Sequence, residues 1–323
     1  MSDRLQKILL YGVASPLTFL VSLLLGAYWT FPYDQLRDFI VQQAETNGGI
    51  QLEIQSLEPS WVTGVEATGV RVILPSEDPS ERPAELLIRE VSARVSLLSL
   101  LSGTTEVSFE AELDAGRIEG VYAQSDEQTH VEATLSDVDL RRIGPLRSAI
   151  GIPITGRASG TIDLTIASEA SATQGSVDLT VRGASIADGR TPIRIEGLGQ
   201  AGLTLERMSL GDLRLRMGVE RGVGRIEELH ADGEDAELRG TGTVRLMQPL
   251  RMSGLDLLLR VSFKQRYRES NDRMRGLFTL LDINPQVRPA RTDDGSLQWR
   301  ISGSFGGRFR MVPSGRTPMA GAD

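Results

Sequence analysis

Apolar and polar side chains alternate in short runs along most of the chain, which is the pattern of strands that bury one face. The positions between apolar residues are mostly polar, as at Thr161, Asp163 and Thr165. Turn residues separate the runs, for example at 187–189 and 231–234. This pattern predicts antiparallel sheet with one apolar and one solvated face. The runs that predict strands are 50–54, 91–97, 162–166, 177–181, 193–195, 203–205, 213–217, 255–261 and 297–301.

Three segments have helical spacing instead. Residues 33–44 predict a helix that Asp34 caps and that stops at 47–49. Residues 140–146 predict a short helix broken around Gly144-Pro145. Residues 267–281 carry an apolar stripe opposite several arginines, a pattern that favours packing against a sheet over binding a partner. The polar segment 76–83 predicts a loop.

Residues 8–31 contain no charged side chain. A helix of this length can cross the hydrocarbon core, and Pro16 is tolerated in membrane helices. Tyr28, Trp29 and Tyr33 lie where aromatic rings favour the headgroup layer. A cleaved signal peptide is the main alternative, but it needs a shorter apolar core and a small-x-small site that is missing here. A buried core helix fits less well still, because the run is so long and uniformly apolar. We therefore expect an uncleaved transmembrane anchor.

The basic residues near this span are Arg4 and Lys7 before it, while the next one is Arg37. The positive-inside rule keeps the first residues in the cytoplasm and exports the rest. We thus expect residues 1–7 in the cytoplasm, 8–31 as the anchor, 32–312 as one β-rich domain and 313–323 as a flexible tail. In a bacterium this is a single-pass inner-membrane protein with a periplasmic domain.

Composition excludes several classes of function. The 323 residues carry a formal net charge of −8 and have a pI of about 5.1, so a nucleic-acid partner is disfavoured by repulsion from phosphate. The chain has no cysteine, which excludes disulfides, thiolate metal sites and cysteine nucleophiles.

Three features of the sequence could carry chemistry, and each also has a structural explanation. Residues 197–202 match G-x-G-x-x-G, but a strand-like run follows where a nucleotide site needs a helix. His130 and His230 are isolated beside turn residues, which favours solvated loop histidines over metal ligands. The acidic groups at 227–228 and 232–235 lack calcium-site spacing. The sequence therefore predicts no catalytic residue, no cofactor, no metal site and no enzymatic activity.

Three glycine-containing regions of the sequence resemble segments of known protein families. Residues 140–146 followed by 151–164 resemble a phrase of AsmA-like envelope proteins, in which a short helix leads into G-x-P-(I/L)-x-G-x-x-x-G-x-(I/L)-x-L. Residues 240–246 and 249–257 resemble the carboxy-terminal half of GspN, the N component of type II secretion systems. Residues 295–305 fit the closing strand of that family. Gly156 and Gly160 permit close strand approach, although hairpin punctuation explains them equally well.

The resemblance implies a non-enzymatic inner-membrane accessory component of type II protein secretion, with other envelope components as partners. It also implies a mainly β fold in which an elongated, twisted, mostly antiparallel sheet with a few short helices follows the anchor. The alternative is an AsmA-like protein that binds or transfers lipid by shielding acyl chains in an apolar groove. The two hypotheses differ in whether the apolar face of the sheet is covered or open. An envelope hydrolase, the third possibility, has no residue constellation to support it.

Overall fold

The computed structural model describes residues 33–48, 51–61, 63–74, 84–144, 153–191, 204–248, 252–305, 309–317 and 319. The expected cytoplasmic residues 1–7, anchor 8–31 and loop 76–83 lie outside this part of the chain. Among the described helices, none is long and apolar enough to cross a membrane.

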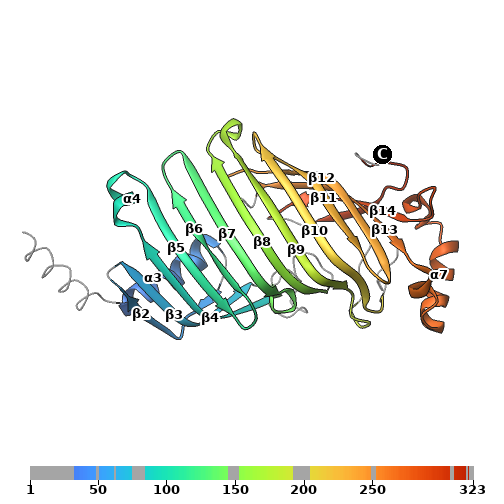
Figure 1. Ribbon diagram of the computed structural model, residues 1–323, viewed down its shortest axis with the longest axis horizontal. Helices are drawn as coiled ribbons and strands as arrows, with labels where there is room; N and C mark the ends of the chain where they lie inside the picture. The colour runs from blue at the N-terminus through green and yellow to red at the C-terminus, as the bar shows by residue number, and fades with distance from the viewer. Residues whose placement is uncertain are drawn as a thin grey trace, which may run out of the picture.

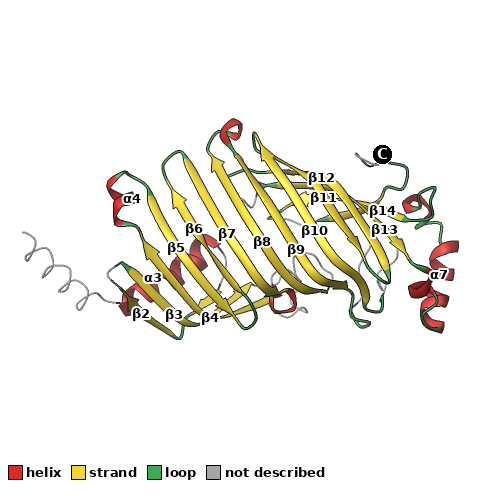
Figure 2. Ribbon diagram, in the orientation of Figure 1, coloured by secondary structure: helices red, strands yellow, loops and turns green. Residues whose placement is uncertain are grey.

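The protein is mainly β, and its strands form one large antiparallel sheet (Figures 1 and 2). Each strand pairs with the next along the chain from β3 to β15, while β1 and β2 both pair with β3. Short hairpins can join antiparallel neighbours, but β13 and β14 are joined through the helical segments between residues 265 and 290. The strands are β1 (Gln51–Glu53), β2 (Ser56–Ser60), β3 (Gly64–Leu74), β4 (Ala84–Val95), β5 (Thr105–Leu113), β6 (Arg117–Gln124), β7 (Gln128–Asp139), β8 (Ile154–Ala167), β9 (Gln174–Ile186), β10 (Met208–Glu220), β11 (Val223–Asp232), β12 (Ala236–Arg245), β13 (Gly254–Phe263), β14 (Leu297–Ser304) and β15 (Arg310–Pro313).

The two longest helices lie towards the two ends of the sheet, and the shorter helical segments lie in the connections between strands. In Figure 1, α3 lies at the end formed by β2–β4 and α7 lies beyond β13 and β14. Asn271 caps α7 by accepting a hydrogen bond of 2.9 Å from the Met274 backbone N–H. The helical segments are α3 (Tyr33–Gly48), α4 (Leu97–Leu101), η2 (Leu140–Arg142), η3 (Ala170–Ala172), α6 (Gln265–Arg268), α7 (Asp272–Ile283) and η5 (Arg288–Ala290).

Glycines on one face let neighbouring strands approach closely. A Cβ on Gly120 would lie 2.0 Å from the carbonyl oxygen of Glu132, and one on Gly160 would lie 2.0 Å from that of Asp178. Gly160 also has a φ of +146°, which L residues rarely adopt. Gly156 and Gly160 both lie within β8, so close strand approach is confirmed and hairpin punctuation is wrong for them.

The main core runs along one end of strands β5 to β14 and includes residues of α6 and α7. Met274 and Phe278 of α7 are buried against Val261 and neighbouring strand residues. Phe278 meets Phe263 edge-on, with the ring centroids 5.0 Å apart. The apolar stripe of 267–281 therefore packs against the sheet, as its spacing predicts.

Several boundaries differ from the predictions. The single helix expected over 267–281 is two helices, because Asn271 starts a new one after α6. Asp34 lies inside α3, since that helix already begins at Tyr33. The strand expected at 203–205 is not found at residues 204 and 205, the part of it that the structure describes. Residues 204–207 are irregular, and β10 begins at Met208. The run 193–195 lies outside the described residues.

The carboxy-terminal segment is more ordered than expected. The tail was expected to fray from Pro313, but Pro313 ends β15. Beyond it, the carbonyls of Ser314 and Thr317 each accept a 2.7 Å hydrogen bond from the Gln298 side chain. The alternation pattern gives no sign of this, because the contact joins a strand to an irregular segment.

Candidate functional site

The strand register places the apolar residues of successive strands on one face. Leu179 of β9 lies directly opposite Leu215 of β10, and Leu215 lies opposite Leu229 of β11. A second row crosses the sheet beside this one. It consists of Phe109, Gly120, Ala133, Ile162, Val177, Met217 and Ile226. We call this surface, on strands β5 to β14, the apolar face.

The middle of the apolar face is only partly covered. Phe109, Ile162, Leu179 and Leu215 all keep an intermediate exposure, although Ala133 and Val177 in the same rows are buried. Residues nearer the α7 end of the strands are buried as well. Leu210, for example, is 2% exposed. A second sheet packed on the face would bury these side chains. Among the described residues the strands pair only with their neighbours in one sheet, so no second sheet covers the face.

The apolar face carries no charge in its central strands. At the paired positions of the described strands β5 to β10, every charged side chain lies on the opposite face. Arg214, for example, alternates with Leu213 and Leu215 along β10. This surface therefore suits apolar chains or apolar side chains.

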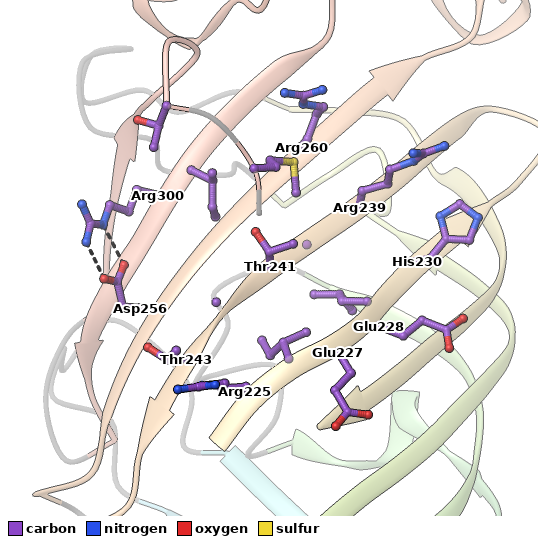
Figure 3. A pocket seen from close by; sticks show the side chains of 17 residues that line it. Arg225, Glu227, Glu228, His230, Arg239, Thr241, Thr243, Asp256, Arg260 and Arg300 are labelled. Carbon is purple, nitrogen blue, oxygen red and sulfur yellow. Dashed lines mark hydrogen bonds and ion pairs between the residues drawn. The ribbon is translucent and has the colours of Figure 1, made fainter. Parts of the chain in front are cut away.

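The opposite, polar face is hollowed at its carboxy-terminal end. A groove of about 860 Å³ lies over β11 to β14, and Thr317 and Met319 form part of its wall. Its lining includes several arginines and carboxylates, as Figure 3 shows. Arg300 donates from Nε to Oδ1 of Asp256 over 2.7 Å, and this bond lowers the pKa of the Asp256 carboxyl.

The histidines considered above as possible metal ligands lie far apart in the sheet. His130 lies within β7, where Nδ1 is 3.1 Å from Thr165 Oγ1, and His230 lies within β11. Their expected placement in loops is therefore wrong. The described residues contain no group of three or more potential metal ligands. The glycine-rich stretch 197–202 lies largely outside the described part of the chain.

The acidic groups at 232–235 are engaged in the structure. Asp232 accepts a 2.7 Å hydrogen bond from Lys264 Nζ, which lowers the pKa of the Asp232 carboxyl. Asp235 accepts from the Ser209 backbone N–H over 2.8 Å, and Glu234 lies 2.9 Å from Arg266. These carboxylates fix the ends of strands, which explains them without a bound ion.

The polar groove was missed by sequence reasoning. Its arginines occupy ordinary solvent-facing positions of alternating strands, so each looks like surface charge on its own. Only the register between strands brings them together.

Comparisons with protein-family models, with curated proteins and with solved structures give no match to this chain.

Proposed function

We propose that the protein is a non-enzymatic, inner-membrane-anchored component of type II protein secretion that binds an apolar partner along its sheet. The observation that carries this proposal is the charge-free, partly covered middle of the apolar face. A surface of this kind on an exported domain favours a partner, because soluble proteins rarely leave large apolar patches open.

The secretion context rests on the resemblance, and the strand pattern supports it. Residues 156–164 fall within β8, residues 240–245 within β12 and residues 297–304 within β14. The short η2 segment precedes β8, as in the AsmA-like phrase. We accordingly propose an AsmA-like, elongated and twisted sheet, tethered by residues 8–31, with the described domain in the periplasm.

A complementation experiment tests this function. Cells that lack the gene are expected to lose secretion of type II exoproteins into the medium, and the wild-type gene to restore it. Leu179→Glu with Leu215→Glu puts charge on the apolar face and is expected to abolish restoration. Thr180→Glu, one residue along β9 and on the polar face, is the matched control and should restore export. Unchanged export in the deletion strain would rule out the secretion role.

The second candidate is a lipid-binding or lipid-transfer protein. The absence of charge along β5 to β10 favours it, because acyl chains need a continuous apolar surface. Purified full-length protein, exchanged from detergent into amphipol and extracted with solvent, should then yield lipid by mass spectrometry. The Leu179→Glu, Leu215→Glu variant should yield much less than the Thr180→Glu control. Equal yields from the two variants would contradict this function.

A further inference from the structure

Three arginines and one histidine occupy successive opposed positions across four strands of the polar face. Arg214 of β10 lies opposite His230 of β11, which lies opposite Arg239 of β12, which in turn lies opposite Arg260 of β13. We call these four residues the cationic row. With strands ~4.8 Å apart, the row spans ~14 Å. Like charges directly opposite each other destabilise a sheet.

The row is incompletely neutralised. Arg239 pairs with Glu237 at 2.5 Å, and Arg260 lies 3.6 Å from Asp294. No ion pair between described residues includes Arg214. Arg216, the next residue of β10 on the same face, does form ion pairs: it lies 3.0 Å from Glu228 and 4.0 Å from Asp178. Arg214 is therefore the one arginine of the row without an ion pair to a described residue, on a chain whose net charge is −8.

The row also borders the polar groove. His230, Arg239 and Arg260 line it together with Arg225 and Thr241, whereas Arg214 does not (Figure 3). The carboxylates of Glu227, Glu228 and Asp256 line it too, and two of them are paired, Glu228 with Arg216 and Asp256 with Arg300. Arg225 has no ion pair with any other described residue. Arginines bind phosphate bidentately, and threonine hydroxyls add neutral donors. A volume of about 860 Å³ is enough for a ligand with several phosphate groups.

We propose that the cationic row and the groove beside it form a binding site for an anion with two or more phosphate groups. A multivalent anion would neutralise opposed arginines on neighbouring strands at once, which a single small anion cannot do. The phosphates can belong to a soluble oligophosphate or to a lipid headgroup, and both present the same chemistry. This proposal concerns the polar face and does not depend on the function proposed for the apolar face.

Calorimetric titration of the full-length protein in a non-ionic detergent at low salt tests the site. Sodium pyrophosphate is the soluble probe, and mixed micelles that contain cardiolipin, a lipid with two phosphate groups, are the headgroup probe. We expect the Arg214→Gln, Arg239→Gln variant to bind at least tenfold more weakly than the wild type. Arg117→Gln is the matched control, because Arg117 lies on β6 and is already paired with Glu110 and Glu112. Its binding should not change.

The outcomes separate the two phosphate sources. Binding of pyrophosphate that the double variant loses supports a soluble ligand. Binding of the cardiolipin micelles alone, again lost in the variant, supports a headgroup. A wild type that binds neither probe, or a double variant that binds as well as the wild type, overturns the proposal. Both arginine side chains are exposed, so the variant should melt close to the wild type without ligand, and such a melt excludes misfolding as the cause.

Discussion

Arg260 of β13 and Gln298 of β14 lie directly opposite each other, and the Arg260 Nε donates a hydrogen bond of 3.0 Å to the Gln298 Oε1. Gln298 is fully buried, and its Nε2 donates to the carbonyls of Ser314 and Thr317. One buried amide therefore joins the cationic row to the carboxy-terminal segment.

Gln298→Leu is expected to lower the free energy of unfolding by about 2 kcal/mol, because buried polar partners lose their hydrogen bonds. It should also speed tryptic cleavage after the exposed Arg316, since Thr317 is released. Limited proteolysis and a denaturant melt measure the two effects. Gln286→Leu on an exposed loop is the control and should change neither.

Close strand approach on the apolar face makes Gly160 hard to replace. Gly160→Ala should destabilise the protein by at least about 2 kcal/mol, because of its positive φ and its contact with the Asp178 carbonyl. Gly276→Ala is the opposite case, since nothing lies within 4 Å of the new Cβ on α7. That change should stabilise by about 0.5–1 kcal/mol. Denaturant melts that rank the two variants in the reverse order would contradict this account of the glycines.

The openness of the apolar face has a thermodynamic consequence along β10. Leu210 is 2% exposed, whereas Leu215 keeps an intermediate exposure. Leu210→Ala should cost about 2–5 kcal/mol, the usual price of a buried leucine. Leu215→Ala should cost less than half as much, because less of its surface is removed from water. Equal losses in urea melts would mean that an element outside the described residues covers the face.

Acid stability should depend on Asp294. Hydrogen bonds from Ser296 and Thr292 lower the pKa of this carboxyl to about 2. A lowered pKa adds stability that is fully present above the unfolded value and is lost as the pH falls toward 2. The melting temperature of Asp294→Asn should therefore fall less steeply than that of the wild type between about pH 4 and pH 2. Asp293→Asn, at an exposed neighbouring position, should follow the wild type.

Alternation predicted the strands that have unbroken runs, such as β8, β9, β10 and β13. It gave no run for β2, β3, β5, β6, β7, β11, β12 or β15. In β6 and β12, glycines such as Gly120 and Gly240 occupy positions of the apolar face and so weaken the alternation. It also could not give the order of strands or their register. Those depend on contacts between distant residues, and both the apolar face and the cationic row exist only through register.

The same limit explains the missed helix break. The spacing of 267–281 is continuous in sequence, but Asn271 turns its side chain to cap α7 and to donate to Glu206. That choice depends on where Glu206 lies in the fold. The sequence pattern identifies the apolar stripe but does not show that the segment divides into two helices.

Photo-crosslinking in living cells is the most direct test of the central claim, which is that the apolar face binds a partner. A photoreactive amino acid is placed at Leu179 on the apolar face or at Thr180 on the polar face, adjacent positions of β9. We predict adducts from position 179, to a secretion component or to lipid, and few from position 180. The absence of adducts at 179, or equal labelling at both positions, would contradict the account.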